Sequence, residues 1–142
     1  RSTSSPPGAE LERSGSASRA VLIEGVRGGV ALGACVIVLA VLGLTPSLSW
    51  LPELPLVTVA LVLPVVAFGL IGHRAGLRSG RLASGALAGA LAGAISGGVG
   101  GVAFVVFGKP ALNVAVGILL GVVGGVLVGA AGALVGRRIA RL

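Results

Sequence analysis

Two runs of regularly spaced glycines constrain the fold of this chain more than any other feature of its sequence. In each run a glycine recurs at every fourth residue. The first run consists of Gly85, Gly89, Gly93, Gly97 and Gly101, and the second of Gly117, Gly121, Gly125 and Gly129. A four-residue step returns to nearly the same face of an α-helix, so each run, here called a glycine ladder, predicts a helix with a stripe that has no side chains. Such stripes let helix backbones approach closely, which is a main source of helix association in lipid.

Charged residues are too few to cover the surface of a soluble domain of this length. They make up 11% of the 142 residues, whereas 55% are hydrophobic and the mean hydropathy is +1.09. A soluble domain carries roughly a quarter charged residues. The first ladder alone extends over about 24 Å of helix, which is most of the hydrocarbon thickness of a bilayer. The composition therefore predicts an integral membrane protein without a sizeable soluble core.

Apolar segments separated by turn residues predict four membrane spans. They cover about 28–44, 54–72, 82–107 and 111–136. Residues 1–19 are rich in Ser, Pro and Gly, so we expect a disordered cytoplasmic tail or linker there and a transmembrane domain over 20–142. A short interfacial helix is expected to lead into the first span, with Glu24 and Arg27 one turn apart.

The positive charges predict the orientation of these spans. Ten of the eleven basic residues fall on one side of the four-span arrangement, and Lys109 falls on the other. The ten are Arg1, Arg13, Arg19, Arg27, Arg74, Arg78, Arg81, Arg137, Arg138 and Arg141. By the positive-inside rule we expect a multi-pass protein of the plasma membrane with both termini in the cytoplasm. The charges therefore indicate topology and not a nucleic-acid interface, which would bring a soluble face and aromatic residues for stacking.

The third span carries one row of large apolar residues among rows of Gly, Ala and Ser. The row is Leu87, Leu91, Ile95 and Val99, and a shorter small-residue stripe, Gly25, Gly29 and Gly33, begins the first span. The predicted fold class is all-α, a polytopic bundle of four transmembrane helices in which helices three and four pack through their ladders. Two interpretations of the ladders stay open: packing within one chain, or a glycine zipper that lines a pore or joins copies of the chain.

No motif in the sequence predicts a catalytic, cofactor or metal site. The four predicted spans contain no Asp, Glu, Lys, Arg or His, the usual marks of ion and proton pathways in membranes. His73 has no clear nucleophile or orienting partner, so we expect a solvated residue at the cytoplasmic boundary. Cys35 has no second cysteine to pair with and is expected to be a small buried residue. We therefore predict a protein that is not an enzyme and that holds no cofactor or metal.

An arginine-rich connection, residues 73–81, joins the second and third spans. Arg74, Arg78 and Arg81 have two open roles there. They orient the chain during insertion, or they contact anionic lipid headgroups.

Residues 68–93 read FGLIGHRAGLRSGRLASGALAGALAG, an arginine-rich turn followed by a helix of small residues. This stretch and the four-span layout resemble uncharacterised small four-helix, glycine-rich membrane protein families of prokaryotes. The resemblance implies a small integral membrane protein from a prokaryote. It implies no activity and no functional residues.

These features favour a structural role. The expected function is a membrane anchor or assembly module, serving a cytoplasmic domain or partner next to the Ser/Pro-rich tail. The chain begins with Arg1 and not with Met, so a processed product or the end of a longer protein stays open. The alternative is an oligomeric channel, a holin-like pore or a small transporter subunit, favoured by the ladders and by Pro64, which should kink the second span. The expected partners are the lipid bilayer, anionic lipids, and a second copy or another membrane protein, and no nucleic acid is expected.

Overall fold

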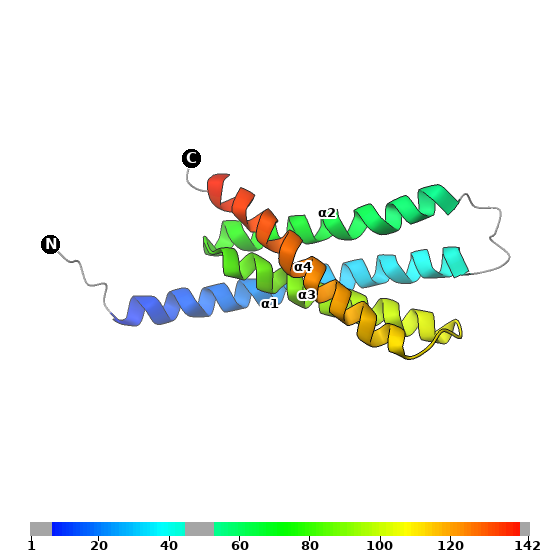
Figure 1. Cartoon of the computed structure of the whole chain (residues 1–142). Coiled ribbons are helices and arrows are strands. Elements are labelled where there is room, and N and C mark those ends of the chain that lie inside the picture. The colour runs from blue at the N-terminus through cyan, green and yellow to red at the C-terminus, as the bar shows by residue number, and fades with distance from the viewer. Residues whose placement is uncertain (1–6, 45–52, 140–142) are drawn as a thin grey trace.

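The computed structural model describes residues 7–44 and 53–139, and within these residues the secondary structure is helical, without strands. The helices are α1 (Pro7–Leu44), α2 (Glu53–Ser79), α3 (Leu82–Val106) and α4 (Leu112–Ile139) (Figure 1). Each contains a segment long and apolar enough to span a membrane. These segments are Val21–Gly43, Val57–Ser79, Leu82–Val106 and Leu112–Ile139. The prediction of an all-α chain with four candidate membrane-spanning helices is therefore confirmed.

The first helix begins at Pro7, within the segment expected to be a disordered tail. Proline suits the first turn of a helix, because the N–H that it lacks would have no partner there and its φ is already helical. The residues AELER that follow are good helix formers. With 38 residues, α1 is about 57 Å long, and its first turns project beyond the other helices (Figure 1). The part of the expected tail in residues 1–6 lies outside the described residues.

The connection between α2 and α3 is shorter than the sequence suggested. α2 continues to Ser79, so Arg74 and Arg78 lie on its last turns and not in a loop. Gly80 then has a φ of 65°, a left-handed conformation that glycine adopts most readily and that commonly ends a helix. The N–H of Arg81 donates to the Ser79 hydroxyl over 3.2 Å, which supports this two-residue turn.

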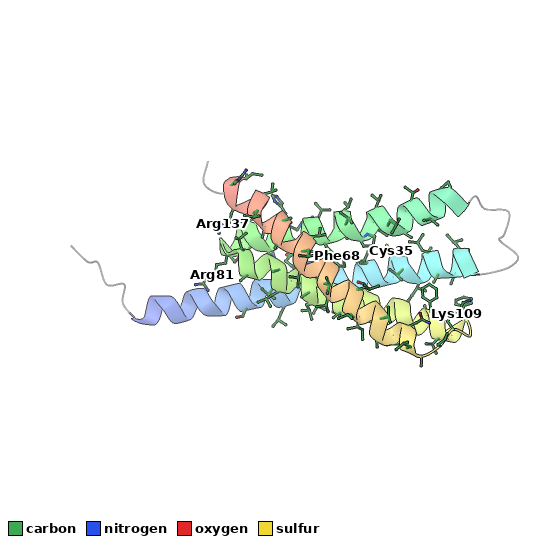
Figure 2. All side chains as sticks on the ribbon, in the orientation of Figure 1. Cys35, Phe68, Arg81, Lys109 and Arg137 are labelled. Atoms are coloured by element: carbon green, nitrogen blue, oxygen red, sulfur yellow. The ribbon has the colours of Figure 1, made fainter. Side chains whose placement is uncertain are left out.

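α3 and α4 form the centre of the bundle and share its most extensive helix contact. α1 packs mainly on α3, and α2 packs mainly on α4. Figure 1 shows the start of α1, the α2–α3 turn and the end of α4 at one end of the bundle. Toward the opposite end, which carries Lys109, the α1–α2 pair and the α3–α4 pair spread apart (Figure 2). The bundle is therefore closed at the arginine end and splayed at the Lys109 end.

A small buried core lies where the four helices meet. It contains Leu32, Phe68, Ile71, Ala75, Ala88 and Ala92, and Val128 of α4 packs against it. Most other large apolar side chains are exposed on the outer faces of the helices. Cys35 is also exposed, so the expectation of a buried cysteine was wrong. Its apolar neighbours in the sequence do not distinguish a core-facing position of a helix from an outward-facing one.

Candidate functional site

The two glycine ladders lie against each other in an antiparallel register. The pairs are Gly85–Gly129, Gly89–Gly125, Gly93–Gly121 and Gly97–Gly117. In each pair, a Cβ added to either glycine would come closer to the carbonyl oxygen of the other than real Cβ atoms approach. The fifth glycine of the first ladder, Gly101, continues the register at Asn113 and Val114, where a Cβ would lie 2.7 Å from the Asn113 carbonyl oxygen. The backbones of α3 and α4 are therefore in direct contact along both ladders.

A different kind of interface joins α1 to α3. The short stripe of α1 meets the large row of α3 in a parallel register, with pairs Gly25–Leu91, Gly29–Ile95 and Gly33–Val99. A Cβ added to Gly33 would lie 3.4 Å from the Val99 side chain, an ordinary van der Waals contact. The glycine stripe of α1 and the large apolar row of α3 can both be identified from the sequence. Their pairing cannot, because the residues of one helix do not indicate which other helix packs against them.

The interface between α2 and α4 uses small residues of which the sequence analysis identified only Gly129, as part of the second ladder. On α2 they are Gly69, Gly72 and Gly76, and on α4 they are Gly129, Gly132, Ala133 and Gly136. A Cβ on Gly76 would lie 2.7 Å from the Ala133 Cα, and one on Gly136 would lie 2.6 Å from the His73 carbonyl oxygen. On each helix the spacing between successive glycines of this interface is three residues and then four. A pattern with a constant four-residue spacing therefore does not include them all. The partly buried His73 thus packs at the end of α4.

Glu24 is buried in the bundle, although the sequence placed it in an interfacial lead. The residue is 7% exposed, and its Oε1 lies 2.5 Å from Nη1 of Arg78 on α2. Its ion-pair partner therefore comes from a neighbouring helix, and Arg27, one turn away on α1, is exposed. The first predicted span, about 28–44, contains no ionisable residue, whereas the candidate span of the structure, Val21–Gly43, begins earlier and includes Glu24 and Arg27. This pairing offsets part of the cost of burying the Glu24 carboxylate.

The arginines predicted to contact anionic lipid fall into two groups. Arg78 is engaged by Glu24, although 56% of its side chain stays exposed. Arg74 and Arg81 are exposed and are not part of the Arg78–Glu24 ion pair. Arg137, on the last turn of α4, lies at the same end of the bundle as Arg81, far from Lys109 (Figure 2). One end of the molecule is therefore strongly basic.

An apolar cleft of about 460 Å³ lies between the two helix pairs, on the splayed side of the core. Residues from all four helices line it, among them Val36, Pro64, Phe68, Phe104 and Leu120. A second hollow of about 360 Å³ adjoins it and shares Val36, Ala60, Pro64 and Phe104 as lining residues. Among the residues that line the 460 Å³ cleft, Ser96 and Asn113 have polar side chains. The cleft is thus a hydrocarbon-like space that continues between α1 and α2.

Within the described residues, no group of three His, Cys, Asp or Glu side chains is placed to hold a metal ion. Comparisons with protein-family models, with curated proteins and with solved structures found no match to this chain. The resemblance carried by residues 68–93 therefore stays a prediction.

Proposed function

We propose that this chain is a multi-pass integral protein of the plasma membrane with a structural role, as a membrane anchor or assembly module. The apolar outer surface carries the proposal. Val30, Leu70 and Leu119, on three different helices, are 60%, 53% and 63% exposed. Soluble monomers rarely expose contiguous apolar patches larger than a few hundred Å². In a bilayer the same side chains face acyl chains, so this surface suits lipid as its solvent.

The charge distribution supports an orientation with both ends of the described chain in the cytoplasm. Arg81 lies at the closed end of the bundle and Lys109 at the splayed end, and Arg74 belongs to the part of α2 that leads to Arg81; both arginines are exposed. Anionic lipids of the cytoplasmic leaflet attract basic groups near the surface by about 1 kcal/mol per charge. We propose that Arg74 and Arg81 contact these headgroups, while Arg78 serves mainly as the partner of Glu24.

The glycine contacts favour the structural role over an oligomeric glycine zipper. The two ladders contact each other within one chain, so neither presents a free glycine stripe to a second copy. Close backbone approach of this kind is a main source of helix association in lipid, where the hydrophobic effect does not drive helices together. We therefore propose that the ladders hold α3 and α4 together as the centre of the bundle, and a channel, holin-like pore or transporter subunit is the less favoured role.

Membrane insertion is tested by expressing the chain and extracting the membranes with alkaline carbonate. The protein should remain in the membrane pellet, and its release into the supernatant would contradict the proposal. For orientation, Cys35→Ala removes the native thiol, and Lys109→Cys or Arg138→Cys introduces a single new one. An impermeant maleimide should label the first variant in intact cells and the second only after lysis.

The structural role is tested by light scattering of the purified chain with the detergent contribution removed, followed by flux assays in liposomes. A monomer that passes no ions or small solutes agrees with an anchor. A defined oligomer that conducts would replace this proposal with the pore.

A further inference from the structure

We propose that the cleft between the helix pairs holds one acyl chain of a phospholipid, with the lipid phosphate at Lys109. This inference rests on the membrane location proposed above. It adds a specific lipid site on the side of the bundle opposite the arginines.

The chemistry of the lining selects a hydrocarbon occupant. Ser96 and Asn113 are the polar side chains of the lining. Both already make bonds within their own segments: the Ser96 hydroxyl donates to the Gly93 carbonyl over 3.4 Å, and one N–H of Asn113 Nδ2 donates to the Pro110 carbonyl over 2.9 Å. The remaining lining side chains are apolar. A polar solute would lose hydration there and gain few partners, whereas an acyl chain gains van der Waals contact along the whole lining.

The shape of the cleft fits a chain and not a compact molecule. Along α4 its lining runs from Asn113, near the α3–α4 turn, to Val128, which packs on the core. This stretch corresponds to about 22 Å of helix, while one leaflet contributes about 15 Å of hydrocarbon. The lining residues on α4 recur at steps of three and four, so they form one continuous stripe along that helix. An acyl chain that enters from the splayed end can therefore lie along α4 with its terminus at the core.

Lys109 supplies a cation at the splayed end of the bundle, where the lining of the cleft reaches Phe104 and Asn113 on either side of the α3–α4 turn. Lys109 does not itself line the cleft, but its N–H donates to the backbone carbonyl of Phe104, a lining residue, over 3.0 Å, which fixes the lysine backbone close to that residue. Lys109 is exposed, and Figure 2 shows it at the splayed end of the bundle. A phosphate at the mouth would place its negative charge beside this cation, while the acyl chain occupies the apolar space behind.

The test compares two neighbouring substitutions on α2. Val65 lines the cleft and is 54% exposed, whereas Val66 does not line it and is 52% exposed. The full chain and its Val65→Trp and Val66→Trp variants are purified in a mild detergent, washed free of lipid and incubated with phosphatidylglycerol. Native mass spectrometry then counts the retained lipid. The unsubstituted chain and Val66→Trp should each retain one phospholipid, and Val65→Trp should retain at least fivefold less.

A second matched pair of substitutions controls for the case in which Val65→Trp loses lipid because it misfolds. Ala60→Phe reduces the cleft at the point where its two hollows join, and Ala115→Phe makes the same change on an exposed position of α4 that does not line it. Lys109→Gln should keep the lipid but lower the preference for phosphatidylglycerol over phosphatidylcholine by about fivefold. Equal retention within both matched pairs would overturn the acyl-chain site. Release of the protein by carbonate would instead overturn the membrane location, so the two failures are distinguishable.

Discussion

α3 packs on two neighbours by opposite means. Against α4, glycine meets glycine, and the atom in the way of any added side chain is a backbone carbonyl oxygen. Against α1 the approach loosens along the stripe: a Cβ on Gly29 would lie 2.9 Å from the Ile95 Cβ, whereas one on Gly33 would meet only the Val99 side chain, at 3.4 Å. A helix backbone shifts only when the whole helix moves, whereas a side chain can change its rotamer. Glycines that look alike in the sequence should therefore differ widely in what they tolerate.

The largest effect is expected from a bulky residue in the ladder contact. Gly93→Leu would place a side chain on the backbone of Gly121 and should force α3 and α4 apart. We expect it to lower the free energy of unfolding by about 3 kcal/mol or more. Gly43→Leu is the matched control, because no atom lies within 4 Å of a Cβ added there. Thermal unfolding in detergent should show a much lower midpoint for Gly93→Leu, and equal midpoints would refute the ladder contact.

A single methyl group gives the finer test of the two interfaces. Gly93→Ala still meets a carbonyl oxygen and should cost about 1–3 kcal/mol of stability. Gly33→Ala meets the Val99 side chain at an ordinary distance, and alanine in a helix is favoured over glycine by roughly 0.5–1 kcal/mol. The second variant should therefore be as stable as the unsubstituted chain or slightly more so. Denaturant unfolding in mixed micelles measures both, and a similar loss in both variants would show that the interfaces do not differ.

The smallest effect is expected from the ion pair that ties α1 to α2. Arg78→Gln leaves the buried Glu24 carboxylate without its partner, whereas Glu24→Gln leaves an arginine that is already half exposed. Arg78→Gln should therefore destabilise the protein more than Glu24→Gln. Because 56% of the Arg78 side chain is exposed, water screens its attraction to Glu24, and the coupling energy from a double-mutant cycle should be about 1 kcal/mol. A coupling above the cost of Gly93→Ala would mean that this ion pair contributes more to stability than a ladder contact does, which would reverse the order expected here.

Much of the fold was predictable because it depends on properties of single helices. The low charge content and the apolar segments predicted four candidate spans, and their order along the chain is observed. The span predicted at 82–107 appears as Leu82–Val106, and the one at 111–136 as Leu112–Ile139. The boundaries of α1 and α2 were less accurate. Helix-forming residues extend both helices into segments whose polarity suggested a tail and a loop.

The site was predictable only in part. The ladder residues were identified from their spacing, and α4 does lie against α3 as expected. The mixed three- and four-residue spacing of Gly69, Gly72 and Gly76 concealed the α2–α4 contact. The partner of Glu24 is distant in the sequence, and no local pattern indicates Arg78. The cleft is likewise invisible in the sequence, because it exists only where two helix pairs diverge.

The sequence by itself determined the helical class, the number of apolar helices and the end of the bundle on which the arginines gather. These follow from hydropathy and charge, which are read along one chain segment at a time. Only the tertiary structure decided that α1 lies on α3 and α2 on α4, that Cys35 faces outward and that a cleft opens beside Pro64. Several faces of this chain are equally rich in small residues, so the choice among them depends on how closely two particular surfaces fit.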